Sequence, residues 1–421
     1  MLSPDTIGFA NSAMLAWRNV IRHRWRSALV VATIVFGVAA TILANGFVEW
    51  ILWATRETTI HSQLGHIQIT KRGYRRSGSA DPFAYLLPED GPIQGVLEHT
   101  QHVRIVAPRI AFSGLVSHGD VTLSFLGEGV QPDKEVAMSR VHGLGRPAVD
   151  IVRGEDLSNV KPYEIVMGRG LAANMGVKVG DTVTLLANTR SGGMNAVEVR
   201  IRGIFSTISK AFDDSALRVP LRTAHELLRV SGDQRIVVLL DRTRNTDEVL
   251  SGLRERLAGQ PVDVTPWYEL ADFYNKTAAL FARQTAVVRL LMAIIIILAI
   301  SNSMTMNVSE RISEIGTAMA LGTHRMRILL QFLAEGGLLG ILGGIAGGII
   351  GVFGARVISA IGIPMPPPPG QSWGYSAQMM VTGPIVASSF ALAVAAALLA
   401  TLYPAWKASR LQIVDALRHN R

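Results

Sequence analysis

The stretch Ser27–Val48, SALVVATIVFGVAATILANGFV, contains no charged residue. As an α-helix rising about 1.5 Å per residue it would extend about 33 Å, enough to cross a hydrocarbon core about 30 Å thick. Core helices of globular proteins are seldom charge-free over this length, so a membrane span is favoured. A cleaved signal peptide is the alternative. The apolar stretch is longer than the usual h-region of about 7–15 residues, and we therefore expect a retained anchor.

Three further runs repeat this pattern. Leu290–Ser309 and Gly336–Ala355 are charge-free, and the interval between Arg356 and Lys407 leaves room for an outer loop and a span near Gly383–Tyr403. We expect a membrane protein of four transmembrane α-helices with an α+β domain inserted between helices 1 and 2. The expected segments are an interfacial amphipathic helix (1–26), span one (27–49), the outer domain (50–285), span two (286–308), a cytoplasmic coupling region (309–334), span three (335–356), an outer loop (357–381), span four (382–404) and a cytoplasmic tail (405–421).

Composition agrees with a mixed protein. The chain is 49% hydrophobic and 17% charged, with a net charge of +9, which is too apolar for a single soluble domain and too polar for an all-membrane bundle. Cysteine is absent from the sequence, so the sequence offers no disulfide, zinc–thiolate site or thiol nucleophile.

Basic residues crowd the ends of the apolar runs and set the orientation. Those before span one are Arg18, Arg22, Arg24 and Arg26, and those after span four are Lys407, Arg410, Arg418 and Arg421. The positive-inside rule therefore predicts that both termini are cytoplasmic and that the segments 50–285 and 357–380 face outward.

An amphipathic helix is predicted ahead of span one. Met14, Trp17, Ile21 and Trp25 recur at helical spacing beside a stripe of arginines, a pattern typical of a helix in the headgroup layer. A nucleic-acid patch is the alternative, but the adjacent span makes lipid phosphate the nearer anion.

The outer domain alternates β-type runs with turn residues. The predicted strands are His66–Thr70, Val103–Ala107, Val121–Leu126, Thr182–Leu186, Val197–Ile204 and Ile236–Leu240, and a helix is predicted from Thr246 to near Leu257. No metalloprotease or nucleophile-elbow motif occurs, so we predict no catalytic residue and no metal site. Asp213 and Asp214 are interpreted as a solvated turn, because adjacent side chains of a strand or loop point apart.

Between spans two and three, residues 310–322 predict a short amphipathic helix. Ile312, Ile315 and Met319 share one face, which must be buried on something; lipid headgroups and a protein partner both remain open. After Gly322, Thr323 is the predicted cap of the next helix.

Span three carries two adjacent lines of glycine. Gly336, Gly340, Gly344 and Gly348 recur every fourth residue, beside Gly343, Gly347 and Gly351. Glycine costs about 1 kcal/mol per residue in a helix relative to alanine, so this register predicts close helix packing, either within the chain or across a dimer.

Together these motifs resemble the FtsX-like permeases of ABC transporters, the group with the macrolide-exporter (MacB) and lipoprotein-releasing (LolC/LolE) types. The most specific resemblance is Glu310-Arg311-x-x-Glu314-Ile315-Gly316 with Ala320-Leu321-Gly322, followed by a basic segment, Glu335 and the glycine-rich span. Residues 403–408 and 414–418 resemble the family's tail, and residues 170–181 with 203–205 its periplasmic module. The resemblance implies a periplasmic domain of two lobes, one of them inserted. It also implies ATPase-coupling residues: Glu310, Arg311, Glu314, Ile315, Met319, Leu321, Gly322 and Arg325.

One departure from the macrolide-exporter type is informative. The sequence contains no Gly-Lys pair and hence no Walker A loop, so this chain is expected to be non-catalytic and to bind no cofactor itself. ATP and Mg²⁺ are expected on a separate cytoplasmic ABC ATPase, present in two copies, with a second permease chain, identical or related, as partner. By length and organisation the chain is most similar to the lipoprotein-releasing permeases.

The resemblance therefore implies a multi-pass inner-membrane permease that releases lipoproteins toward a periplasmic carrier. The first alternative is a MacB-type exporter of peptides or drugs that works with a periplasmic adaptor and an outer-membrane channel. The second is a scaffold that regulates a cell-wall hydrolase.

Overall fold

The computed structural model describes residues 24–78, 81–89, 91–367, 370, 372 and 374–412. The chain divides into two units. The membrane unit is formed by the chain up to Ile51, Ala278–Pro364 and the chain from Ser376; the outer unit is formed by Leu52–Thr277 and Met365–Tyr375. The predicted interfacial helix up to residue 23 and the tail motif at 414–418 lie outside the described residues.

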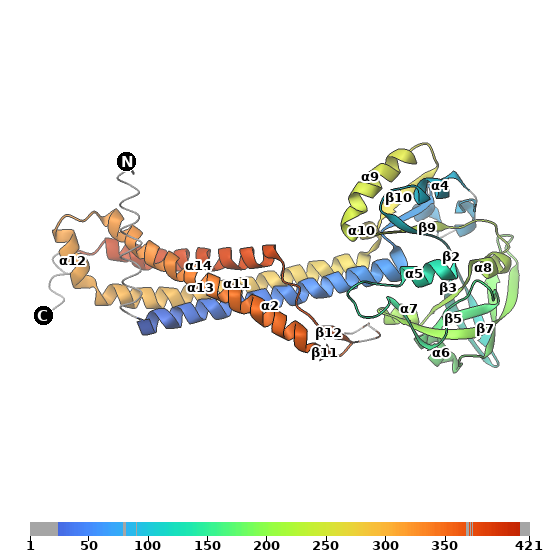
Figure 1. Cartoon of the computed structure of the whole chain (residues 1–421), viewed down its shortest axis with the longest axis horizontal. Coiled ribbons are helices and arrows are strands. Elements are labelled where there is room, and N and C mark those ends of the chain that lie inside the picture. Colours follow the sequence, from blue (N-terminus) through green and yellow to red (C-terminus); the bar gives the residue numbers. More distant parts are fainter. Residues whose placement is uncertain are drawn as a thin grey trace. The chain divides into compact units, whose positions relative to one another are not determined.

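The four longest helices are each long and apolar enough to cross a membrane (Figure 1). They are α2 (Arg24–Thr59), α11 (Asp272–Glu310), α13 (Arg325–Ile361) and α14 (Gly383–Ser409). Each helix is longer than its expected span, because backbone hydrogen bonding continues beyond the apolar residues. The α+β segment falls between the first and second of these helices along the chain, which confirms the predicted fold class.

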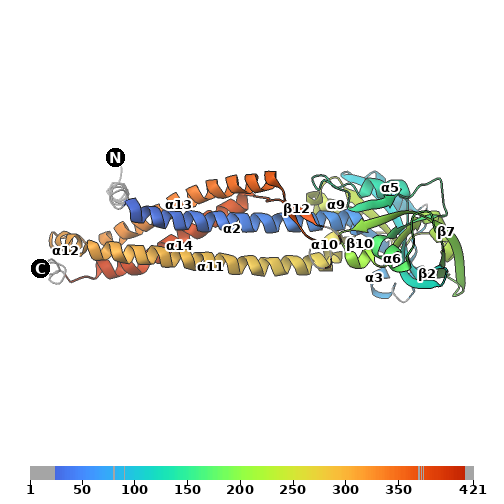
Figure 2. The ribbon, with the colours of Figure 1, turned by 90° about the horizontal axis from the view of Figure 1, so that it is seen from below.

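Within the membrane unit, α2 and α11 lie side by side (Figure 2). Ile34 and Ile42 of α2 are buried in one cluster with Ile296 and Ile300 of α11. At Gly37 an added Cβ would lie 3.2 Å from Ile296 Cδ1. The small residue therefore lets the two backbones approach closely, as is common between membrane helices.

The outer unit is built on one ten-stranded sheet. Its strands are β1 (Ile67–Lys71), β2 (Val103–His118), β3 (Val121–Val130), β4 (Val149–Gly154), β5 (Glu164–Gly168), β6 (Thr182–Asn188), β7 (Met194–Thr207), β8 (Ala216–Pro220), β9 (Arg235–Leu240) and β10 (Val262–Pro266). The strand order is β10-β1-β9-β2-β3-β8-β5-β7-β4, and β6 pairs with both β2 and β7.

Short helices complete the described chain. In the outer unit they are η1 (Ile60–Leu64, a π-helix), α3 (Tyr74–Ser77), η2 (Pro82–Tyr85), α4 (Pro92–Glu98), α5 (Pro132–Met138), α6 (Arg169–Met175), α7 (Lys210–Asp213), α8 (Leu221–Leu228), η3 (Thr243–Asn245), α9 (Thr246–Arg256) and α10 (Trp267–Leu270). One more short helix is α12 (Ile312–Ala320). Two short strands, β11 (Ile363–Met365) and β12 (Tyr375–Ala377), pair with each other.

Pairing of β6 on both sides closes a ring of six strands, β2-β3-β8-β5-β7-β6. Its interior is apolar, with Phe112 and Phe125 meeting edge to face at a centroid distance of 5.6 Å. This barrel is the inserted lobe, because all its strands lie between residues 103 and 220.

The other lobe is an open layer of β10, β1, β9 and the first half of β2. Helices α4 and α9 bury Leu97 and Leu253 on one face of it, against Ile69 and Val238. Strand β2 runs through both lobes, since it pairs with β9 up to Arg109 and with β6 from Gly114.

The six predicted strands are all present, most of them longer than predicted, and β4, β5, β8 and β10 were missed. Two pairs, β3 with β8 and β5 with β7, are parallel, and the other described pairs of this sheet are antiparallel. The solvated-turn interpretation is wrong for Asp213, which is 2% exposed. Burial raises the pKa of this carboxyl, while hydroxyl groups of Ser372, Thr207 and Ser206 donate to it and oppose the shift.

Candidate functional site

The segment between the second and third candidate spans folds as the predicted short helix, α12. The helix ends in a Schellman turn, in which Gly322 N donates to Met319 O (3.0 Å) and Thr323 N donates to Ala318 O (3.0 Å). This turn places Gly322 at φ +90°, a conformation that favours glycine. The next helix has His324 as its N-cap, so the predicted Thr323 cap is wrong.

The apolar face of α12 is buried within the chain itself. Ile315 and Met319 join an apolar cluster formed by the ends of the neighbouring helices. The other buried members of this cluster are Val308 of α11, Ile328 and Phe332 of α13, and Ala405 and Ala408 of α14. These two side chains therefore anchor α12 on the membrane unit.

A buried carboxylate adds a polar anchor. Glu335 of α13 is 1% exposed. It accepts hydrogen bonds from Arg311 Nη1 (3.0 Å) and from Asn307 Nδ2 of α11 (3.3 Å). Arg311 Nε also donates to Glu314 (3.2 Å), and the guanidinium lies 5.6 Å from the Phe332 ring centroid. Arg311 therefore links α11, α12 and α13.

The predicted coupling residues thus fall into two groups. Arg311, Ile315 and Met319 point into the bundle. The remaining residues form an exposed ridge: Glu310, Glu314, Leu321, Gly322 and Arg325. The side chain of Leu321 is 83% exposed.

The glycine lines of α13 contact two different helices of the same chain. A Cβ added at Gly340 would lie 2.7 Å from Ala397 Cβ of α14, and one at Gly336 would lie 2.2 Å from Thr401 Cγ2. On the adjacent line, a Cβ at Gly347 would lie 2.7 Å from Val38 Cβ of α2. Gly344 and Gly343 are equally crowded, by Phe390 and Ile34 respectively. Gly348 is the exception, because its nearest neighbour would be 3.8 Å away.

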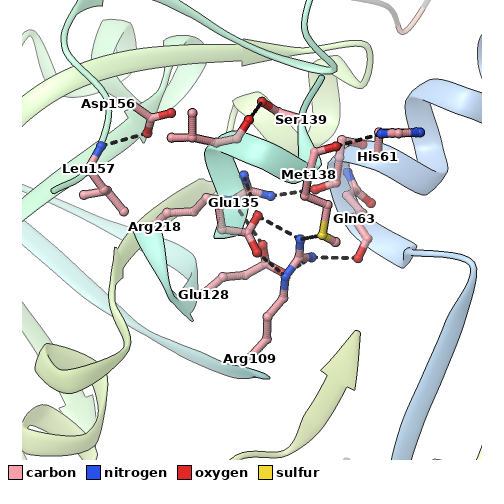
Figure 3. Close-up of polar contacts among 12 residues, drawn as sticks. His61, Gln63, Arg109, Glu128, Glu135, Met138, Ser139, Asp156, Leu157 and Arg218 are labelled. Carbon is pink, nitrogen blue, oxygen red and sulfur yellow. Dashed lines mark hydrogen bonds and ion pairs between the residues drawn. The ribbon is translucent and has the colours of Figure 1, made fainter. Parts of the chain in front are cut away.

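The outer unit holds a second polar site, where the two lobes meet on β2 (Figure 3). Arg109 of β2 is fully buried and donates to both oxygens of Glu135 of α5, at 2.7 and 2.8 Å. Arg218 of β8 donates to Glu128 of β3 (3.3 Å), which also accepts from Arg235 of β9. Five elements of the two lobes are therefore joined through charge-assisted hydrogen bonds.

The same arginines hold the π-helical turn η1. Arg109 Nη1 donates to the carbonyl of Gln63 (2.7 Å), and Arg218 Nη2 donates to the carbonyl of Ser62 (2.6 Å). These bonds satisfy backbone carbonyls at a helix end, which otherwise remain unpaired. The network therefore fixes η1 against the sheet.

Electrostatics within this network favour the charged forms. Burial raises the pKa of Glu128, but Arg109, Arg218 and Arg235 outweigh it and lower the pKa to about 2. Next to it, burial raises the pKa of Asp156. In the network, the carboxylates of Glu128 and Glu135 face three guanidiniums. This arrangement matches a structural role better than proton transfer, since a general acid or base needs a pKa near the operating pH.

Sequence reasoning missed this network. The available signal was a single charge inside otherwise apolar β-type runs, as at Arg109 in IVAPRIAF and Arg218 in ALRVP. Charged side chains in buried strands are seldom left without a partner. Which arginine meets which glutamate depends on strand pairings distant in sequence, and these are not legible from the pattern.

Comparisons with known proteins match both parts of the chain. Residues 27–256 match the family described as the MacB-like periplasmic core domain, and residues 286–413 match the FtsX-like permease C-terminal family. The chain is 25% identical over 348 residues to the lipoprotein-releasing system transmembrane protein LolC of Xylella fastidiosa, covering 76% of this chain and 81% of that one.

It is also 27% identical over 414 residues to the macrolide export ATP-binding/permease protein MacB of Brucella abortus, covering 93% of this chain but only 58% of that relative. Among solved structures, the periplasmic region of MacB from Actinobacillus actinomycetemcomitans aligns with a TM-score of 0.36 and 14% identity, covering 52% of this chain and 95% of that chain.

We predict that crowding separates the glycines of α13. Gly340→Ala and Gly347→Ala should each lower stability by about 1–3 kcal/mol, because the added methyl group overlaps Ala397 or Val38. Gly348→Ala should not lower it, since that site has room and alanine is the better helix former. Thermal unfolding of the purified chain in detergent measures this; equal midpoints for Gly340→Ala and Gly348→Ala would contradict the packing.

A second prediction concerns the buried network. Arg109→Met should destabilise the outer unit by about 3–5 kcal/mol, because Glu135 loses its bidentate partner. Arg109→Met/Glu135→Met should recover part of that loss, since the uncompensated charge is gone. Pulse proteolysis of the full chain in urea measures both, with the exposed Arg153→Met as control. A double variant less stable than the single would refute the pairing.

Proposed function

Since this chain belongs to the FtsX-like permeases of ABC transporters that carry a MacB-like periplasmic core domain, we propose that it transmits the motion of a separate ATPase to its outer domain. The transmission begins at the exposed ridge on α12, which would dock into the ATPase on the cytoplasmic side. ATP binding and hydrolysis then occur on the partner, and this chain performs no chemistry.

The observation that carries the proposal is the packing of α12 against the membrane unit. If α12 were loosely attached, a push from the ATPase would move this helix alone, and the displacement would not reach the rest of the chain. Here Ile315 and Met319 seat α12 in an apolar cluster, and Arg311 pins it to Glu335. A push on the ridge would therefore move the ends of α11 and α13 together, because packed interiors transmit strain.

The outward half of the path is proposed from the chain's connectivity. Helices α2 and α11 lead directly into the outer domain along the sequence. At the end of α2, η1 is fixed to both lobes by Arg109 and Arg218. A displacement of α2 relative to the sheet would therefore act on the junction of the two lobes. Two permease chains, each with one ridge, would serve the two ATPase subunits.

For the cargo, we propose a lipoprotein in the outer leaflet of the inner membrane. LolC, whose printed name is that of a lipoprotein-releasing system protein, matches along 81% of its own length. MacB, named for macrolide export, matches this chain almost end to end but is much longer, and export of a drug or peptide is thus the alternative. Stimulation of ATP hydrolysis in nanodiscs by a purified lipoprotein supports the first; stimulation only by a periplasmic adaptor supports the second.

Orientation is tested by cysteine labelling, because the sequence contains no cysteine of its own. With cytoplasmic termini and coupling loop, a membrane-impermeant maleimide should label Val160→Cys in intact spheroplasts. It should label Leu321→Cys only after the membrane is opened. Both side chains are more than four-fifths exposed, at 84% and 83%, so access to the reagent is matched. Labelling of Leu321→Cys from outside would overturn the proposed topology.

Docking is tested on the same pair of positions. Leu321→Asp should reduce co-purification of the ATPase subunit at least about tenfold, since burying an unpaired carboxylate in the interface is strongly unfavourable. The chain should remain folded, because the side chain makes little contact within it. Val160→Asp, the same substitution at equal exposure in the outer domain, should change nothing. If both variants recover the ATPase like the unmodified chain, the ridge is not the docking site.

A further inference from the structure

A polar cavity of about 470 Å³ opens in the outer unit beside the end of α2. Its walls combine the last turns of α2, β2, the loop after α5 and the segment after β9. Four arginines line it, Arg56, Arg104, Arg242 and Arg244, together with the two carboxylates of Glu57 and Asp241. Another cavity of the outer unit, of about 800 Å³, also has four arginines and two carboxylates, but two of its arginines, Arg75 and Arg254, are paired with Glu269.

Both carboxylates are already occupied by neighbours. Glu57 accepts from Arg56 Nε (3.0 Å) and lies within 3.0 and 3.1 Å of the Thr243 hydroxyl. Asp241 lies 3.0 Å from His102 Nδ1. Across the described part of the chain, the side chains of Arg104, Arg242 and Arg244 have no ion pair and are exposed. The cavity therefore has an excess of positive charge that its own walls leave uncompensated.

A hydrogen-bonded chain keeps the acidic wall rigid. Leu240 N donates to His66 Nδ1 (3.1 Å), so the ring proton is on Nε2 and is donated to Thr243 Oγ1 (3.0 Å). The Thr243 hydroxyl is then free to donate only to Glu57. Burial lowers the pKa of His66 to about 3, and this imidazole stays neutral. Glu57 is thereby held toward Thr243 and Arg56 rather than toward the other arginines.

His61 of η1 also lines the cavity. His61 Nδ1 donates to the carbonyl of Met138 (2.7 Å; Figure 3). Its pKa is lowered, first by burial and then by the positive charges of Arg104 and His142, although the Met138 carbonyl and Glu57 oppose the shift. Burial is the largest of these effects, so the neutral form of His61 is favoured.

We propose that this cavity binds a phosphate-type oxyanion, held by the guanidinium groups of Arg104, Arg242 and Arg244. A guanidinium presents parallel N–H donors that match the oxygens of a phosphate in a bidentate manner. Trp53, also in the wall, lies on α2 only a few residues beyond the charge-free run that ends at Val48. Tryptophan is enriched at the height of lipid headgroups. A phospholipid headgroup is therefore the nearest source of the anion, and a soluble phosphate is the other.

The test uses the full chain, purified in detergent and stripped of phospholipid. Binding of phosphatidylglycerol is measured by native mass spectrometry, and binding of inorganic phosphate by the shift of the unfolding midpoint at constant ionic strength. Arg104→Gln/Arg244→Gln should weaken binding at least about tenfold, because charge-assisted hydrogen bonds are lost. Arg153→Gln/Arg190→Gln, an equal loss of charge at exposed positions of the same unit, should bind like the unmodified chain.

Each possible result of this experiment supports or overturns anion binding by the cavity. A tenfold loss confined to the cavity variant, with phosphatidylglycerol bound more tightly than phosphate, identifies a headgroup site; the reverse order identifies a site for a soluble phosphate. No binding of either probe to the unmodified chain, or equal binding by all three proteins, overturns the proposal. Unfolding midpoints in phosphate-free buffer confirm that the variants fold, and Arg242→Gln alone is the milder substitute if the double variant does not. The inference stands on the cavity alone, so it survives a failure of the ATPase-docking test.

Discussion

The constraint on which the membrane unit depends is that hydrocarbon offers no hydrogen-bond partner to a peptide group. Every amide within a span must therefore bond inside its own helix, and helices that cross together must make contact through packing rather than through water exclusion. The glycines of α13 follow from this: they let α14 approach on one side and α2 on the other. The same packing carries the polar cluster of Arg311 and Glu335, which is satisfied only because three helices converge on it.

This constraint also explains which features were predictable from the sequence. A charge-free run as long as Ser27–Val48 favours a membrane span over a core helix or a signal peptide, so the four spans and the inserted domain could be predicted from the sequence. Alternating runs in the outer domain located six strands. The closure of the barrel was not legible, because it depends on β6 pairing with β2 and β7, and pairing partners are set by packing between distant residues. Strands β5 and β8 were missed because they are short and buried, with little alternation.

The candidate site divides in the same way. Helical spacing gave the apolar face of α12, but it left open what that face rests on. In the structure Ile315 and Met319 face the chain's own helices, whereas Leu321 is exposed. Glu335 belongs to the motif that carries the family resemblance, yet its bond to Arg311 could not be predicted from the sequence, since α12, the turn after it and the first part of α13 lie between the two residues. The four arginines that line the cavity beside the end of α2 are also scattered along the sequence.

The closed ring of the inserted lobe has a consequence for recognition. In the ring, each of the six described strands has a paired neighbour on both sides, so little free strand edge remains in this lobe apart from that of β4. A ligand that reached the ring itself would be contacted mainly by side chains and connecting loops rather than by an added β-strand. With little free strand edge, the ring is also less prone to edge-to-edge self-association.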